Sequence, residues 1–141
     1  MPPCVFCEIV AGERPAHLVL DDDGFVGFLD TRPLFHGHVL VVPRAHHETL
    51  TDLPAELVAP LFKRVQAMAA AVRTAMGAQG SFVAMNNTVS QSVPHLHVHV
   101  VPRRRKDGLR GFFWPRQKYE SDEAMAEVAA SIRAAINRRG A

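Results

Sequence analysis

The sequence predicts an α+β domain built on an antiparallel sheet. Five short apolar runs have the length and the β-branched composition of strands. Two longer stretches repeat apolar residues at three- and four-residue steps, as amphipathic helices do. Strands and helices do not alternate regularly, which argues against a parallel sheet. With 141 residues, 48% of them hydrophobic, we expect a single domain over residues 1–141.

The charge balance and the hydropathy exclude two classes of protein. Sixteen basic residues against 14 acidic ones give a formal charge of only +2, which argues against a dedicated nucleic-acid binder. No run approaches the ~18 apolar residues of a membrane span, and the first residues do not resemble a signal peptide. We therefore expect a soluble, cytoplasmic protein with neither nucleic acid nor membrane as its partner.

Near the N-terminus, residues 4–12 predict a short helix or turn that ends at Gly12. Cys4 and Cys7 are too close in sequence for a disulfide framework and suit a metal or redox pair. A thioredoxin-like pair would follow a strand, and no strand precedes Cys4. Two thiolates on one zinc ion need two further ligands, usually imidazoles. Two free thiols remain the alternative.

The next elements are a hairpin and a third strand. Residues 17–20 and 25–29 flank a turn-forming cluster and predict two antiparallel strands. Asp30 follows the second strand, where a short polar side chain can bond its own backbone in a turn. Residues 37–43 are apolar on both faces, which predicts a central strand.

Two histidines lie at the start of that third strand. Nothing in the sequence groups His36 or His38 with a base or a metal partner. We therefore expect both to be structural or exposed rather than catalytic.

An amphipathic helix is expected over residues 52–76, beginning near Pro54 and ending at Gly77. Its apolar positions are Leu57, Leu61, Val65, Met68, Val72 and Met76. Pro60 lies inside this stretch and should bend the helix or delay its start. A fourth strand is expected over residues 81–85.

The C-terminal third contains three features. The basic run 103–106 is either a solvated loop or a patch that steers a polyphosphate anion. The aromatic residues 112–114 are expected to pack on a partner subunit or to form one wall of a base pocket. Residues 123–139 predict a helix that carries Met125, Val128, Ile132 and Ile136 on one face.

The segment Pro94–Pro102 carries three histidines spaced two apart. In a strand, His95, His97 and His99 would share one face. The aliphatic residues between them would share the other face, so that one face would carry chemistry and the other would join the core. The alternative is an ordinary half-buried strand whose polar face is histidine.

This segment resembles the histidine triad (HIT) family, whose signature is His-φ-His-φ-His-φ-φ with φ apolar; residues 95–101 match it fully. The resemblance implies a five-stranded antiparallel sheet with one long helix, a short N-terminal helix and a C-terminal helix. It also implies a homodimer that acts on a purine nucleotide or nucleotide conjugate, without a catalytic cofactor.

The resemblance implies a role for each of several residues. His97 would attack the α-phosphate and form a nucleotidyl-histidine that water hydrolyses. His99 and Ser92 would donate to the phosphate or to the leaving group, and Asp30 would accept from both ribose hydroxyls. Further substrate contacts would come from Asn86 or Asn87, Gln91 and Val93. This chain departs from the family in that loop, because Ser90 stands where a glycine is usual.

In the branch of the family that keeps an N-terminal cysteine pair, the resemblance implies structural zinc. Its ligands here would be Cys4, Cys7, His46 and His95, with His47 as the alternative to His46.

Several points stay open at this level. A phosphoramidate, a dinucleoside polyphosphate and a nucleotide sugar would all place an α-phosphate at His97, and either water or phosphate could be the acceptor. One alternative is a metallohydrolase with all three histidines on one ion, although neighbouring rings would lie about 7 Å apart at the backbone. Another is a non-catalytic, nucleotide-binding protein stabilised by zinc.

Overall fold

The computed structural model describes residues 3–109 and 116–138, so the aromatic segment 112–114 lies outside the described residues. The chain divides into two compact units, Met1–Asp107 and Gly108–Ala141. The second unit contains helix α3 (Asp122–Arg138), one residue longer at its start than expected. The single domain over residues 1–141 stays a prediction. No helix among the described residues is long and apolar enough to cross a membrane.

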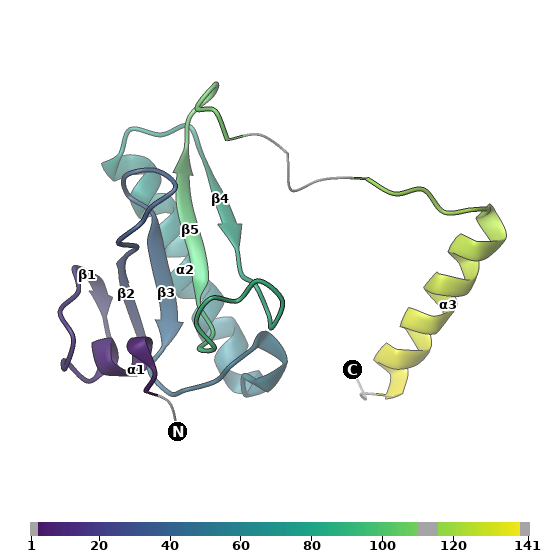
Figure 1. Ribbon diagram of the computed structural model, residues 1–141, viewed down its shortest axis with the longest axis horizontal. Helices are drawn as coiled ribbons and strands as arrows, with labels where there is room; N and C mark the ends of the chain where they lie inside the picture. The colour runs from purple at the N-terminus through teal and green to yellow at the C-terminus, as the bar shows by residue number, and fades with distance from the viewer. Residues whose placement is uncertain (1–2, 110–115, 139–141) are drawn as a thin grey trace. The chain divides into compact units, whose positions relative to one another are not determined.

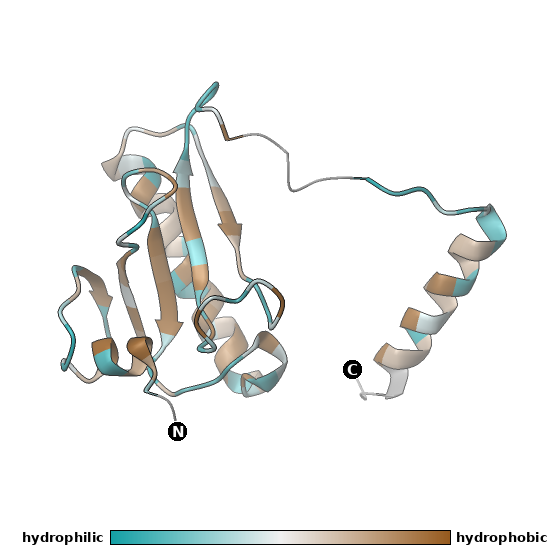
Figure 2. Cartoon of the chain, in the orientation of Figure 1, coloured by the Kyte–Doolittle hydropathy of each residue, from teal (hydrophilic) through white to brown (hydrophobic). Residues whose placement is uncertain are grey.

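The first unit is built on a five-stranded antiparallel sheet, which confirms the predicted fold class (Figure 1). The strands are β1 (Leu18–Asp21), β2 (Phe25–Leu29), β3 (Val39–Pro43), β4 (Gly80–Ala84) and β5 (Val98–Arg103). Their order across the sheet is β1-β2-β3-β5-β4, so β3 is central, as its apolar composition predicts. Figure 2 shows β3 hydrophobic along its length.

Each face of the sheet is covered by helix. Helix α2 (Ala55–Ala75) packs on one face, behind β3 and β5 in Figure 1, and a 3-10 turn (Leu50–Asp52) precedes it. Helix α1 (Val5–Val10) covers the other face with the side chain of Phe6. Because side chains alternate along a strand, Val39 and Val41 join the core under α2, while Leu40 and Val42 join the core under α1.

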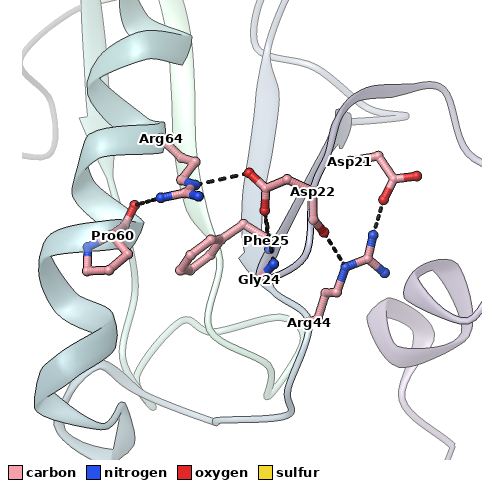
Figure 3. Close-up of polar contacts among 7 residues, drawn as sticks. All are labelled: Asp21, Asp22, Gly24, Phe25, Arg44, Pro60 and Arg64. Atoms are coloured by element: carbon pink, nitrogen blue, oxygen red, sulfur yellow. Dashed lines mark hydrogen bonds and ion pairs between the residues drawn. The ribbon is translucent and has the colours of Figure 1, made fainter.

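Helix α2 begins at Ala55, five residues before Pro60, so the expectation that this proline delays its start is wrong. A hydrogen bond from the Arg64 side chain to the Pro60 carbonyl lies within the helix. Figure 3 shows that Arg64 also binds Asp22, whose carboxylate accepts from the Gly24 and Phe25 amides. These bonds tie the turn between β1 and β2 to α2.

The other end of β2 leads into Asp30 and the candidate site. At the turn between β1 and β2, the Arg44 side chain donates to the carboxylate of Asp21 and to the carbonyl of Asp22 (Figure 3). The hairpin is thus held on both sides, which fixes the position of β2, the strand that Asp30 follows.

The basic run at the far end of β5 has structural partners. Arg103 pairs with Asp107 at 2.6 Å, and Arg104 donates to the Met76 carbonyl at the end of α2. Since β5 rises about 3.3 Å per residue, this run lies roughly 20 Å from His97. That separation favours the solvated-loop interpretation over steering.

Candidate active site and metal centre

The triad segment enters the sheet later than the sequence predicts. Strand β5 begins at Val98, so His95 and His97 precede it. The Leu96 amide donates to the His47 carbonyl at 2.7 Å, which holds this segment beyond the end of the ladder. The alternation is retained, because Leu96 and Val98 lie in the core under α2.

His97 is buried and held in one tautomer. Its Nδ1 lies 2.7 Å from the carbonyl oxygen of His95. A carbonyl only accepts, so Nδ1 carries the proton and Nε2 keeps a lone pair. The centroid of the His97 ring lies 5.0 Å from the ring centroids of Phe6 and His99, and both pairs pack edge to face. These contacts fix the plane of the imidazole. The backbone bond and the ring contacts thus hold this imidazole in one orientation.

His99 is fixed in the complementary tautomer by a chain of hydrogen bonds. The Leu34 amide donates to His38 Nδ1 at 3.0 Å, so His38 carries its proton on Nε2. That Nε2 lies 3.0 Å from His99 Nδ1, which must accept. His99 therefore presents an Nε2–H donor.

The electrostatics agree with these neutral tautomers. Burial lowers the pKa of His99 to about 4, helped by the positive charges that His97 and His38 would carry if protonated. Burial also lowers the pKa of His38, against the opposing effect of the Asp30 carboxylate, whose Oδ2 lies 3.6 Å away. Both rings are neutral at pH 7.

The grouping of His38 with His99 and Asp30 corrects the expectation that nothing groups His38 with a functional residue. In the register of β3 and β5, Leu40 pairs with His99. His38 shares a face with Leu40, so the parity of the third strand is the signal that could have identified it. His36 is exposed, as expected.

Ligand atoms of Asp30, His38 and His99 all lie within 4.8 Å of one another, as they would around an ion. A neutral His38 that bound an ion through Nε2 would need its proton on Nδ1. Nδ1 already accepts from the Leu34 amide, so this group is built to hold a proton rather than a metal.

A cavity of about 490 Å³ opens over these histidines, a size typical of small-molecule sites. Its polar lining includes His97, His99, Ser92 and Asp30, and its apolar walls include Phe6 and Phe28. Asp30 also makes the bond to nearby backbone that is expected of a turn residue: its Oδ1 accepts from the Arg32 amide at 2.9 Å.

Two of the predicted substrate contacts hold the loop after β4 in place. Asn87 Oδ1 accepts from the Leu50 amide at 2.7 Å. Gln91 accepts from the Thr88 amide and donates to the Glu48 carbonyl. These two residues and Asn86 are not part of the cavity wall, whereas Val93 is.

Ser90, which replaces the usual glycine of this loop, has a φ of 62°. The left-handed conformation that favours glycine is therefore adopted without one.

The N-terminal cysteines meet two histidines. Cys4 Sγ lies 3.4 Å from His95 Nδ1, and Cys7 Sγ lies 3.3 Å from His46 Nδ1 and 3.5 Å from His95 Nδ1. A tetrahedral zinc ion at about 2.3 Å from sulfur and about 2.05 Å from nitrogen separates such atoms by about 3.5 Å. The donor set and its spacing therefore fit zinc.

The protonation of this group points the same way. His95 Nε2 lies 2.9 Å from the Pro43 carbonyl, so its proton is on Nε2 and the Nδ1 lone pair faces the sulfurs. Burial, a hydrogen bond that the Cys7 thiol donates to Cys4, and the negative charge of Cys4 raise the pKa of Cys7 to about 11. A cation is needed to hold two thiolates here at neutral pH.

The three histidines of the triad thus have different environments. His95 faces the cysteines, His97 faces the cavity, and His99 accepts from His38. Within residues 3–109 and 116–138, no group of metal-ligating atoms contains all three. This geometry does not fit the alternative in which all three histidines bind one metal ion.

Fold and triad together define a domain of a known class, and the comparison with known proteins identifies that class. The model of the HIT domain matches residues 11–106, and the chain belongs to the HIT family.

Two relatives have named activities. Adenylylsulfatase HINT3 of Arabidopsis thaliana is 37% identical over 108 residues, which span 75% of this chain and 55% of the relative. Adenosine 5'-monophosphoramidase HNT1 of Saccharomyces cerevisiae is 32% identical over 126 residues, 85% of this chain and 75% of the relative.

One similar solved structure has the same fold and is described as zinc-bound. The zinc-bound histidine triad family protein of Mycobacterium smegmatis superposes with a TM-score of 0.72 at 39% identity. The match covers 91% of this chain and 96% of that protein.

Proposed function

We propose that this chain is a hydrolase that splits nucleotide conjugates at the α-phosphate through a nucleotidyl-histidine intermediate on His97. The observation that carries the proposal is the hydrogen bond from His97 Nδ1 to the His95 carbonyl. It leaves the Nε2 lone pair for the cavity. Relatives named for the hydrolysis of adenylyl sulfate and of an adenosine phosphoramidate support this class of substrate.

In the first step, His97 Nε2 forms a bond to the α-phosphorus. The bond from phosphorus to the leaving group breaks, and the leaving group keeps the electron pair and takes a proton from water. The Nε2–H of neutral His99 donates to a phosphoryl oxygen, and the Ser92 hydroxyl donates to the leaving group. Asp30 accepts from the ribose hydroxyls.

In the second step, a water oxygen bonds to phosphorus. The bond from phosphorus to Nε2 breaks, its electron pair returns to His97, and the proton of the water passes to solvent. The imidazolium of the intermediate is stabilised by the His95 carbonyl, which accepts from Nδ1. Burial lowers the pKa of His95 and of His99, so neither neighbour repels this cation.

Zinc is the metal that the donor set fits. Cys4, Cys7, His46 and His95 would hold it, and when bound it supplies a crosslink between α1 and the triad segment. The choice of His46 over His47 is supported by the position of its Nδ1 beside Cys7 Sγ. No step of the reaction needs the ion.

The experiment that tests the function is single-turnover hydrolysis of adenosine 5'-phosphoramidate, with release of AMP followed in time. We expect turnover by the native chain and a loss of at least about 10³-fold in His97→Ala. Tight binding of AMP with no turnover by the native chain would favour a non-catalytic nucleotide-binding protein. The implied homodimer stays a prediction, which sedimentation velocity tests.

A further inference from the structure

The cavity contains polar groups that the proposed reaction does not use. His97, His99 and Ser92 act at the phosphate, and Asp30 acts at the ribose. Arg14 and Arg32 also line the cavity, and they are its arginines within the described residues. The backbone amide of Arg32 donates to Asp30 Oδ1, which places this residue next to the carboxylate proposed to bind the ribose.

Arg14 belongs to a different wall. Its Nε donates to Glu8 Oε2 at 2.8 Å, and Glu8 lies on α1. The α1 residues Val5 and Ile9 line the cavity together with Arg14, whereas Glu8 does not. The carboxylate therefore holds the guanidinium from outside the cavity.

The bond to Glu8 uses only one edge of the guanidinium. Within the described part of the chain, no other acceptor engages it, and half of the Arg14 side chain is exposed. Four N–H groups on the terminal nitrogens remain, and two of them form a parallel pair of donors. Such a pair suits a ligand edge that carries two acceptors side by side.

A purine placed between the apolar walls would present its edge to polar groups at the rim. Guanine carries the acceptors O6 and N7 side by side, which an arginine fork binds with two hydrogen bonds. Adenine carries one acceptor beside an amino group, which opposes a donor. We propose that Arg14 reads the edge of the base and makes guanosine conjugates the preferred substrates. This inference rests on the proposed function.

The test is the ratio of kcat/KM for guanosine and adenosine 5'-phosphoramidates, measured on the full chain with zinc. We expect the native chain to prefer the guanosine substrate about 10-fold or more, and Arg14→Leu to bring the ratio close to one. Arg32→Leu removes the same charge from the same cavity and should leave the ratio unchanged. Glu8→Gln, which weakens the hold on Arg14, should give an intermediate ratio.

A native preference for adenosine, or an unchanged ratio in Arg14→Leu, would overturn the inference while leaving the hydrolase intact. If neither substrate turns over, the proposed function fails instead. Binding of GMP and AMP to the His97→Ala protein then still tests the base preference without chemistry. A GMP preference lost in the His97→Ala/Arg14→Leu double variant supports the role of Arg14, and equal binding contradicts it.

Discussion

His38 Nε2 lies 3.0 Å from His99 Nδ1, and the proton between them belongs to His38 because the Leu34 amide occupies its other nitrogen. A backbone amide thus sets the tautomer of a side chain in the cavity through one intervening ring. This series of hydrogen bonds forms only while His99 is neutral, because Nδ1 must accept. In the proposed reaction, His99 would therefore stabilise charge as an Nε2–H donor and would not deliver a proton as an imidazolium.

The first prediction concerns the hydrogen bond between His38 and His99. His38→Leu removes the donor to His99 Nδ1 and frees the His99 ring to adopt either tautomer. We expect kcat to fall about 10- to 100-fold with little change in KM, because the lost interaction acts on the transition state.

His38→Gln is the matched control, since its amide nitrogen can replace Nε2 as a donor. It should retain more activity than His38→Leu, and its kcat should show the same pH profile as the native chain. Equal losses in both variants would indicate that His38 acts through packing alone.

The second prediction concerns stability against pH. The folded pKa of His99 is about 4, below the value of about 6.5 for an unfolded histidine. Between these pH values the unfolded chain binds a proton that the folded ring does not. Stability is therefore full above about pH 6.5 and falls as the pH is lowered toward 4, by about 3 kcal/mol at most from His99. Urea unfolding across this range, at fixed zinc, measures the slope.

Two variants test the assignment of that slope. His99→Gln should make the slope shallower, because it removes one of the three buried histidines whose pKa is lowered, the others being His38 and His95. His36→Gln, at an exposed position, should leave the curve unchanged. Equal changes of slope in the two variants would contradict the assignment to His99.

The third prediction concerns zinc. Purified native chain should contain about one zinc ion per chain by elemental analysis, and a strong chelator should lower the melting temperature by about 5 °C or more. His46→Ala should lose the metal, because its Nδ1 lies beside Cys7 Sγ. His47→Ala is the control, since the Leu96 amide binds the His47 backbone carbonyl, which alanine retains. Loss of zinc in His47→Ala and not in His46→Ala would reverse the assignment.

Much of the sheet could be predicted from sequence because its signals are local. The turn cluster and Asp30 that flank the second strand predict its observed bounds, Phe25–Leu29. The central position of β3 followed from its apolar composition on both faces. The period of a strand also predicts that His97 faces the cavity while Val98 faces the core.

The remaining features depend on contacts between distant segments. The group formed by His38 and His99 requires the register of β3 with β5, which a single strand does not encode. Tautomers depend on backbone atoms such as the His95 carbonyl and the Leu34 amide, and residue types do not reveal these. The tethering roles of Asn87 and Gln91 arise from partners near residue 50.

The most direct test of the central claim is the intact mass of the protein after rapid, acid-free quenching with an adenosine phosphoramidate. Native chain and His97→Ala are compared. We expect an adduct with the mass of a bound nucleotide on the native chain and none on His97→Ala, because Nε2 of this histidine carries the free lone pair. An equal adduct on both proteins, or steady turnover by His97→Ala, would contradict the central claim.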